Sequence, residues 1–207
     1  MIGIFGGTFD PIHYGHLRSA LEVKHIFGLT EVRLIPSYQP PHRDKPHGSV
    51  GNRLHMLRLA IEGQNGFKID TREIDRQGVS FMVDTLASLR QEFPSQSLLL
   101  FIGGDAFNKL TTWHQWQRLF DLSHVVVMTR PGSPIGQLDD YLVAKQVSDR
   151  QELSQNLVGK LYFQPITQLA ISATAIRTMF AEQFSPRFLL PDAVIAYIRQ
   201  HKLYETL

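Results

Sequence analysis

The sequence predicts an α/β fold with a mainly parallel, doubly wound sheet and helices at the C-terminal end. Three observations carry this prediction. Short apolar runs typical of buried strands alternate with segments whose apolar residues recur at helical spacing. The runs at 98–102 and 124–128 are apolar almost throughout, as in the central strands of a parallel sheet. Glycine pairs directly follow the runs at 2–5 and 98–102, and ligands bind beyond the carboxyl ends of such strands.

The expected elements cover most of the chain. Strands are expected at residues 2–5, 32–36, 98–102, 124–128 and 161–163. Helices are expected at about residues 17–27, 54–61, 83–93, 139–153, 173–182 and 192–201. This order favours a Rossmann-like topology with right-handed crossovers. Because no internal repeat or linker is found, residues 1–207 are expected to form one domain, with 171–207 as its C-terminal helical part.

Composition restricts the possible classes of protein. The 207 residues are 43% apolar and 19% charged, and the net charge of +2 gives no reason to expect a nucleic-acid or membrane partner. The chain has no cysteine, so disulfides and thiolate metal sites are excluded. Neither a signal peptide nor a membrane span is expected, and the expected compartment is the cytoplasm. The oligomeric state is left open.

The first candidate site is the turn after the first expected strand. It reads Gly6-Gly7-Thr8-Phe9-Asp10-Pro11-Ile12-His13-Tyr14-Gly15-His16. The two glycines let the backbone approach a ligand closely, and the following helix offers free amides and a positive dipole end to an anion. The two histidines are three residues apart and project from about the same face of the helix. Together these features describe a pocket for phosphates.

Other interpretations of this turn are weaker. It lacks the Gly-Lys-Ser/Thr of a Walker loop, and its glycine spacing is wrong for a dinucleotide fingerprint. A tight turn with two surface histidines is the plain structural alternative. A zinc site at His13 and His16 needs a third ligand that is not nearby, so no protein-bound metal is expected.

The second candidate site is the segment Ile171-Ser172-Ala173-Thr174-Ala175-Ile176-Arg177. Ser172 has the position of a helix N-cap. A cation in the first turns of a helix opposes the helix dipole, so Arg177 is better tolerated if an anion lies there. Free amides, hydroxyls and one guanidinium describe a second phosphate site, although an ordinary capped helix with a solvated arginine is the alternative.

Both segments resemble motifs of the nucleotidylyltransferase superfamily, His-x-Gly-His and Ile-Ser-x-Thr-x-x-Arg. The Gly-Gly-Thr-Phe-Asp-Pro lead-in is similar to that of the adenylyltransferases of cofactor synthesis. The resemblance implies in-line attack on the α-phosphorus of ATP, with pyrophosphate leaving. Many members carry Ser where this chain has Ala173, which removes one hydroxyl contact.

Three further features concern the acceptor of the nucleotidyl group. The loop Pro40-Pro41-His42-Arg43 places two potential cations after the second strand. Gly103-Gly104-Asp105 places a carboxylate after a central strand. Asp105 can bind ribose hydroxyls there, or it can be the N-cap of a helix. In Thr112-Trp113-His114-Gln115, Thr112 and Gln115 have the spacing of a capping box. If Thr112 is the cap, the amides of residues 113 and 114 are free beside an aromatic plane, which suits a flat ring carrying a carboxylate.

These features and the C-terminal segment resemble the bacterial nicotinate mononucleotide adenylyltransferases. The resemblance implies that His42 and Arg43 reach the phosphates, that Trp113 stacks on the pyridine ring and that the amide of His114 holds its carboxylate. The remaining implied substrate contacts are Met82, Val83 and Arg130, and Met82 stands where the family more often has threonine. The implied ATP-binding residues are Gly6, Gly7, Thr8, Phe9, His13, His16, Arg43, Gly103, Asp105, Ile171, Ser172, Thr174 and Arg177.

The expected reaction needs no covalent nucleophile, because the acceptor phosphate already carries nucleophilic oxygens. His16, beside His13, is expected to stabilise the α-phosphate in the transition state, while Arg43 and Arg177 hold the triphosphate. Mg²⁺ is expected to arrive with ATP and to have few protein ligands. Asp10 is expected to shape the turn.

The expected activity is therefore transfer of AMP from ATP to nicotinate mononucleotide, giving deamido-NAD and pyrophosphate. Nicotinamide mononucleotide and pantetheine phosphate remain alternative acceptors, and CTP an alternative donor. A nucleotide-binding sensor without chemistry is the alternative from another class.

Overall fold

The structure is a computed structural model that describes residues 1–41, 45–129, 135–167 and 169–205. Its described strands form one six-stranded parallel sheet in the order β3-β2-β1-β4-β5-β6. The strands are β1 (Ile2–Gly7), β2 (Glu31–Pro36), β3 (Phe67–Ile69), β4 (Leu98–Gly103), β5 (His124–Thr129) and β6 (Leu161–Pro165). This confirms the predicted Rossmann-like fold. The strand order reverses between β1 and β4, and in such sheets the crevice beyond this reversal is where ligands bind.

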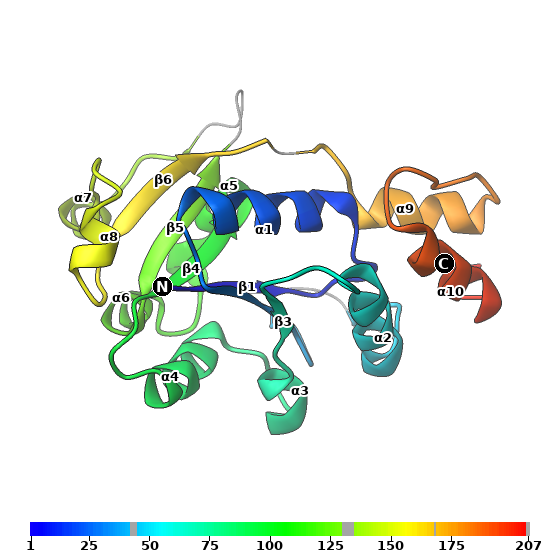
Figure 1. Ribbon diagram of the computed structural model, residues 1–207, viewed down its shortest axis with the longest axis horizontal. Coiled ribbons are helices and arrows are strands. Elements are labelled where there is room, and N and C mark those ends of the chain that lie inside the picture. The colour runs from blue at the N-terminus through cyan, green and yellow to red at the C-terminus, as the bar shows by residue number, and fades with distance from the viewer. Residues whose placement is uncertain (42–44, 130–134, 168, 206–207) are drawn as a thin grey trace.

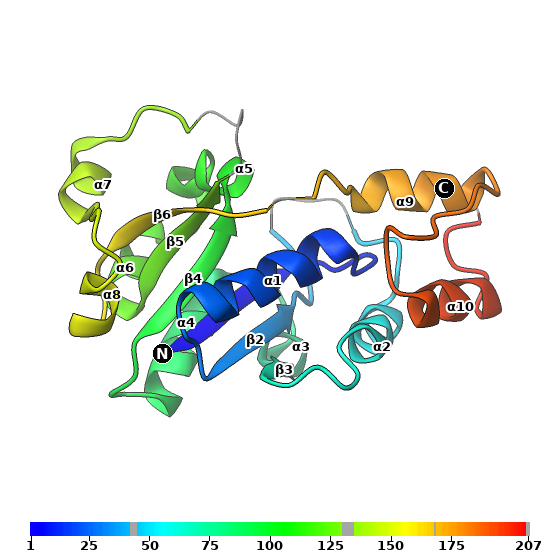
Figure 2. The same ribbon diagram turned by 45° about the horizontal axis from the view of Figure 1, so that its top comes forward.

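Helices cover both faces of the sheet. Figures 1 and 2 show α1 (Tyr14–Ile26) along one face, and α3 (Arg72–Arg76) and α4 (Met82–Glu92) against the other. Side chains alternate across each strand, so Leu99 and Phe101 of β4 pack into the core that contains α1, while Leu98 and Leu100 pack into the core that contains α4. The continuous apolar runs of the sequence follow from this two-sided burial.

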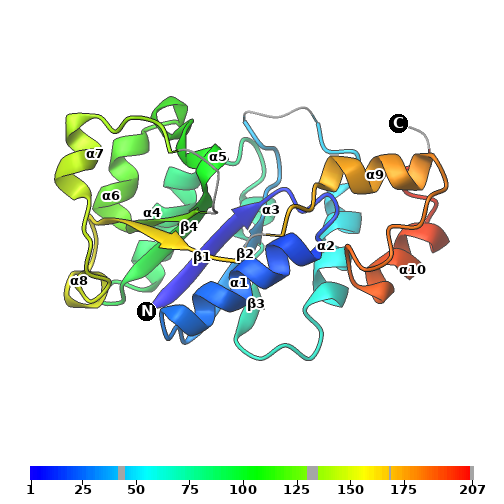
Figure 3. The same cartoon turned by 90° about the horizontal axis from the view of Figure 1, so that it is seen from above.

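The C-terminal helices lie at the end of the molecule farthest from the N-terminus. Figure 3 shows α9 (Ala173–Ala181) and α10 (Asp192–Gln200) there, next to α2 (Val50–Ala60). Ile176 of α9 and Ile198 of α10 belong to the same core as Leu57 of α2. The last helices therefore pack against the helix that follows β2, and α9 lies beside the turn that follows β1.

The helix expected at 139–153 is wrong. The chain instead forms α7 (Asp140–Lys145) and α8 (Glu152–Gln155), which are separated by an extended segment. The amide of Val147 donates to the carbonyl of Leu161 at 2.9 Å, so pairing beside β6 replaces the middle of the helix. The short elements β3 and α3 were not anticipated, since three- to five-residue elements carry little periodicity.

The remaining described elements are short. They are the helices α5 (Gly104–Phe107) and α6 (Leu119–Leu122) and the 3₁₀ turns Leu110–Thr112 and Trp116–Arg118. Within the described ranges, no helix has both the length and the apolar content that a membrane crossing needs.

Candidate functional site

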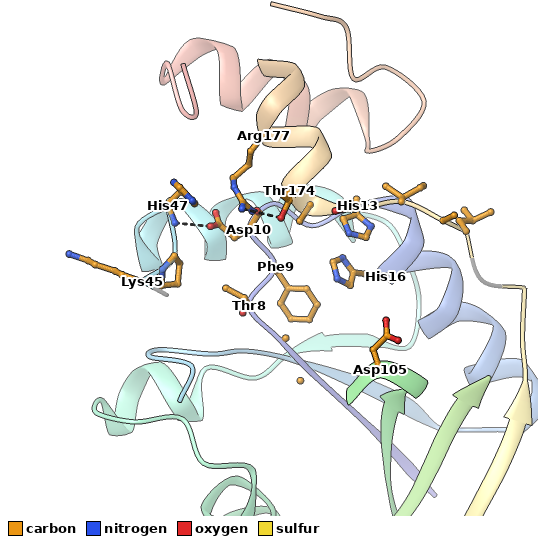
Figure 4. A pocket seen from close by; sticks show the side chains of 18 residues that line it. Thr8, Phe9, Asp10, His13, His16, Lys45, His47, Asp105, Thr174 and Arg177 are labelled. Atoms are coloured by element: carbon orange, nitrogen blue, oxygen red, sulfur yellow. Dashed lines mark hydrogen bonds between the residues drawn. The ribbon is translucent and has the colours of Figure 1, made fainter. Parts of the chain in front are cut away.

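Two adjoining cavities open at the carboxyl ends of β1 and β4. The first has a volume of about 1160 Å³ and the second about 620 Å³. Residues that line both are Gly6, Gly7, Thr8, His13, His16, Asp105, Leu169 and Ile171. Figure 4 shows the first cavity, with the two histidines side by side and Arg177 extending from α9 toward Asp10. The segments near the two ends of the chain thus meet around one cavity, as the sequence predicted.

His13 and His16 form a stacked pair at the start of α1. His13 is the N-cap residue, and the ring centroids lie 3.8 Å apart with an interplanar angle of 26°. Gly15 makes the stack possible, because a Cβ at this position would lie 2.9 Å from His13 Nδ1. The edge of Phe9 supports His16, with 5.2 Å between ring centroids. Two imidazoles are therefore held together where the amides of the helix N-terminus also point.

Burial keeps His13 neutral. The side chain is 5% exposed, and burial lowers the pKa of His13 from 6.5 to about 4. Its Nδ1 is buried without a hydrogen-bond partner in the part of the chain that the structure describes. At pH 7 the ring can donate one hydrogen bond and accept another, which suits a phosphate oxygen without a fixed positive charge.

The lowered pKa of His13 predicts a loss of stability in acid. Between pH 6.5 and about 4 the unfolded chain binds a proton at this residue and the folded chain does not, so the free energy of unfolding falls as the pH falls. From pH 7 to 4.5, wild type is expected to lose about 2 kcal/mol more than His13→Asn. Denaturant unfolding at both pH values measures this. The exposed His25 provides the control, since His25→Asn should lose as much stability as wild type. Equal losses of unfolding free energy in wild type and His13→Asn would show that His13 is not the residue responsible.

Arg177 connects the C-terminal helix to the first turn. Its Nη1 donates to the carbonyl of Asp10 at 2.8 Å and its Nη2 to Oγ1 of Thr174 at 3.3 Å. The Nε donor is buried and has no acceptor among the described residues. Ser172 caps α9 as predicted, with its Oγ accepting from the amide of Ala175 at 3.4 Å. A half-buried guanidinium with a free donor, in the first turns of a helix, is a site for an anion.

Asp10 shapes the turn, as expected. Its Oδ2 accepts from the amide of His47 at 2.8 Å, and its Oδ1 accepts from the amide of Gly48 at 3.0 Å and the hydroxyl of Tyr204 at 2.6 Å. The Asp10 carboxylate is therefore occupied by hydrogen bonds within the protein. Asp105 lines both cavities, and its carboxylate accepts no hydrogen bond from the described residues. Asp105 lies in the first turn of α5, whose N-cap is Gly103, so the alternative that Asp105 is a cap is excluded.

The second cavity contains the aromatic residues. Trp113 and His114 line it, and the His114 ring lies 4.4 Å from that of Phe81. The expected capping box is wrong, because Thr112 ends a 3₁₀ turn and its hydroxyl donates to the carbonyl of Lys109. The amide of Trp113 is consumed by the same turn through the carbonyl of Leu110. The amide of His114 donates no hydrogen bond within the described residues, so one free amide remains beside the indole.

Met82 and Val83 differ in their placement. The Met82 side chain lines the second cavity, and its terminal methyl lies over Gly6, where a Cβ would come within 2.6 Å of Cε. The Val83 side chain is 1% exposed and belongs to the core, so only its backbone is available for the predicted contact.

Most of the predicted site residues line the cavities. In the first cavity these are Gly6, Gly7, Thr8, Phe9, His13, His16, Asp105, Ile171, Ser172, Thr174 and Arg177, and the second adds Gly103, Met82, Trp113 and His114. His42, Arg43 and Arg130 lie outside the described residues, and their roles stay predictions.

Sequence reasoning missed several residues of the site. Lys45 and His47 line the first cavity, and Lys109 and Glu73 line the second. Glu73 is 3% exposed and accepts from Oγ1 of Thr85 at 2.6 Å, and burial raises its pKa. Nothing local in the sequence distinguishes these positions from surface charges.

Arg53, another residue that was not predicted, could have been recognised from the sequence. It occupies an apolar stripe of α2 with Met56 and Leu57, and an arginine on the buried face of a helix indicates polar partners in the interior.

The chain is similar to known proteins over almost its whole length. The family model described as cytidylyltransferase-like matches residues 4–179. A probable nicotinate-nucleotide adenylyltransferase of Methylococcus capsulatus is 49% identical, and the match covers 99% of each chain. A protein of the same description from Hahella chejuensis is 46% identical over 98% of this chain and 95% of its own.

Among solved structures, the nicotinic acid mononucleotide adenylyltransferase of Plasmodium falciparum, complexed with NaAD, superposes with a TM-score of 0.74. The match covers 99% of this chain and 97% of that one, at 17% identity. At that identity the likeness concerns the fold.

Proposed function

Because the chain belongs to the cytidylyltransferase-like family, and within it to the nicotinate-nucleotide adenylyltransferases, we propose that it transfers AMP from ATP to nicotinate mononucleotide. The products are deamido-NAD and pyrophosphate. The observation that carries this proposal is the first cavity, into which α1 brings the stacked histidines and α9 brings Arg177. Two helix N-termini and a guanidinium converge there, and a triphosphate is the kind of ligand that such a site neutralises.

The second cavity supports nicotinate mononucleotide as the acceptor. An indole face suits a pyridine ring, and the free amide of His114 beside it suits a carboxylate. Lys109, which also lines this cavity, adds a positive charge. The cavities adjoin at the histidine pair, so an acceptor in the second cavity has its phosphate near the triphosphate in the first.

The reaction follows from this arrangement. An oxygen of the acceptor phosphate attacks the α-phosphorus of ATP, the bond from that phosphorus to the oxygen bridging to the β-phosphate breaks, and its electron pair leaves with pyrophosphate. The imidazoles of His16 and His13 stabilise the charge on the α-phosphate oxygens, while Arg177 holds the leaving phosphates. The protein positions the groups and neutralises charge, and no side chain becomes covalently attached.

Mg²⁺ fits this site as an ion that enters with ATP. The three hydrogen bonds to Asp10 leave that carboxylate little capacity for a metal, whereas Asp105 faces both cavities. A site with so few carboxylates suits an ion that is bound by substrate phosphates and keeps several waters. When bound, it would neutralise part of the phosphate charge.

Pyrophosphate release with ATP and nicotinate mononucleotide tests the proposal directly. We expect steady release, and a higher kcat/KM with nicotinate than with nicotinamide mononucleotide, because a neutral carboxamide gains less from the free amide. CTP in place of ATP, and phosphopantetheine as acceptor, should give little product. Binding of ATP without release of pyrophosphate would instead indicate a sensor.

Trp113 allows a test of the acceptor site alone. Trp113→Leu is expected to raise the KM for nicotinate mononucleotide about fivefold, since stacking contributes roughly 1 kcal/mol beyond area burial. The KM for ATP should change little, because Trp113 does not line the first cavity. Steady-state kinetics with each substrate varied separately measures both. Trp116→Leu is the matched control, because Trp116 packs against Tyr141 and lines neither cavity. If the KM for nicotinate mononucleotide is unchanged in Trp113→Leu, the pyridine ring does not stack on Trp113.

A further inference from the structure

We infer that Tyr204, three residues from the C-terminus, is a positioning residue for the phosphate site, and that it acts through Asp10 together with the buried Arg53. Neither Tyr204 nor Arg53 is among the described residues that line the two cavities. Both contact the segments that do. The kinetic part of this inference rests on the proposed function, and its structural part does not.

Asp10 is where the segments converge. Its carboxylate receives two amides from the segment between β2 and α2, at His47 and Gly48, and the hydroxyl of Tyr204 from the C-terminal segment. Its carbonyl receives Nη1 of Arg177. Asp10 directly follows Thr8 and Phe9, which line the first cavity. A shift of Asp10 therefore moves the turn, Arg177 and the His47 segment together.

Tyr204 is built to hold this carboxylate. The residue is 6% exposed, and its ring packs in the core near Phe180 with 6.2 Å between centroids. Its hydroxyl lies 2.6 Å from Asp10 Oδ1. Burial and the neighbouring carboxylate raise the pKa of Tyr204, so the hydroxyl keeps its proton and donates it to the hydrogen bond. A charge-assisted hydrogen bond of this kind is among the stronger ones in proteins.

Arg53 completes the arrangement from the other side. It is 1% exposed, and its guanidinium donates to three carbonyls, those of Gly48 at 3.2 Å, Thr8 at 2.8 Å and Tyr38 at 3.4 Å. These carbonyls belong to the first turn and to the two ends of the segment between β2 and α2. Arg53 and Asp10 thus both connect the first turn to the segment between β2 and α2. Arg53 does so by donating to carbonyls of both, and Asp10, within the turn, by accepting from amides of the segment.

Loss of the Tyr204 hydroxyl should affect the binding of the triphosphate more than the binding of the acceptor. The residues that this arrangement holds, Thr8, His47 and Arg177, line the first cavity, and only Thr8 of these also lines the second. Losing the hydroxyl of Tyr204 should therefore weaken ATP binding and lower the rate, while the binding of nicotinate mononucleotide is nearly preserved.

Tyr204→Phe tests the inference, because it removes one oxygen and keeps the buried ring. Tyr197→Phe is the matched control: Tyr197 also lies in the C-terminal part, and its hydroxyl bonds Asn52 on α2 at 3.0 Å, away from the cavities. Hydrogen exchange of the His47 and Gly48 amides is the first readout. We expect it to become about fivefold faster in Tyr204→Phe and to stay unchanged in Tyr197→Phe.

ATP titration by calorimetry and steady-state kinetics are the second readout. We expect Tyr204→Phe to lower the ATP affinity and kcat/KM for ATP about tenfold, with less than about a twofold change in the KM for nicotinate mononucleotide. A double-mutant cycle with Asp10→Asn identifies the route. If Tyr204 acts through Asp10, the double variant should be no more impaired than Asp10→Asn alone.

Other outcomes overturn the inference. If the two phenylalanine variants lose thermal stability alike while exchange at His47 and Gly48 and ATP affinity stay as in wild type, Tyr204 is merely structural. Additive losses in the cycle exclude a route through Asp10. A wild type that releases no pyrophosphate, but whose ATP affinity still falls with Tyr204→Phe, refutes the proposed function and supports the positioning role.

Discussion

Replacing His16 by alanine is expected to lower kcat by about 100-fold or more, the cost of losing one preorganised donor to a developing negative charge. His16 lines both cavities and therefore lies where the acceptor and the α-phosphate meet. Its contribution grows as charge develops on the α-phosphate oxygens, so kcat should fall more than the ATP affinity. Pyrophosphate release under saturating substrates and ATP titration by calorimetry measure the two quantities.

His25→Ala is the matched control for this variant. His25 is an exposed histidine at the other end of the same helix, and its loss should leave kcat within about twofold of wild type. His16→Ala also removes a ring whose centroid lies 3.8 Å from that of His13, so the variant loses the stacking contact as well as the donor. His16→Asn keeps a donor and is expected to retain more activity than His16→Ala. Turnover of His16→Ala within about threefold of wild type would refute the catalytic role.

The parts of the site that could be predicted from sequence are those that are built locally. Gly15 and the two histidines lie within one helical turn, so their spacing alone determines that the rings share a face. Ser172 and Arg177 lie likewise at the start of one helix. Each segment presents amides and a cation or imidazole beyond the end of the sheet, and the parallel topology brings the two segments together. Short-range chemistry and topology were sufficient here.

The parts that could not be predicted depend on contacts between distant residues. The partners of Arg53 are carbonyls up to 45 positions away, and Tyr204 bonds a carboxylate 194 positions away. No spacing rule connects such positions. The same limit explains the helix wrongly expected across 139–153, where local propensity lost to pairing between Val147 and Leu161.

Trp113 shows an intermediate case. Its side chain lines the second cavity, but the free amide expected at this residue is bonded to the carbonyl of Leu110. The Thr112 hydroxyl bonds backward to Lys109 rather than forward, so the turn ends before the indole instead of beginning there. A capping-box spacing identifies a candidate N-cap and does not distinguish it from the last residue of a preceding turn.

Gly15→Ala is expected to lower kcat by about 10- to 100-fold, although alanine is normally the better helix former. A Cβ at residue 15 would lie 2.9 Å from Nδ1 and 3.0 Å from Cε1 of His13, and 3.4 Å from the carbonyl oxygen of Leu169. His13 is 5% exposed and stacked on His16, so its ring has little room to move without displacing its neighbour. Displacing both rings misaligns them with the α-phosphate.

Gly51→Ala is the control that separates this effect from helix propensity. Gly51 lies in α2, and a Cβ there would meet nothing nearer than Ser49 Oγ at 3.9 Å. This variant is expected to gain about 0.5–1 kcal/mol in free energy of unfolding with unchanged kcat, whereas Gly15→Ala should lose both stability and activity. Denaturant unfolding and pyrophosphate release on both variants measure the contrast. If Gly15→Ala instead behaves as Gly51→Ala does, the ring of His13 and the 169 backbone yield to the methyl group, and catalysis does not depend on the close packing of these two histidines.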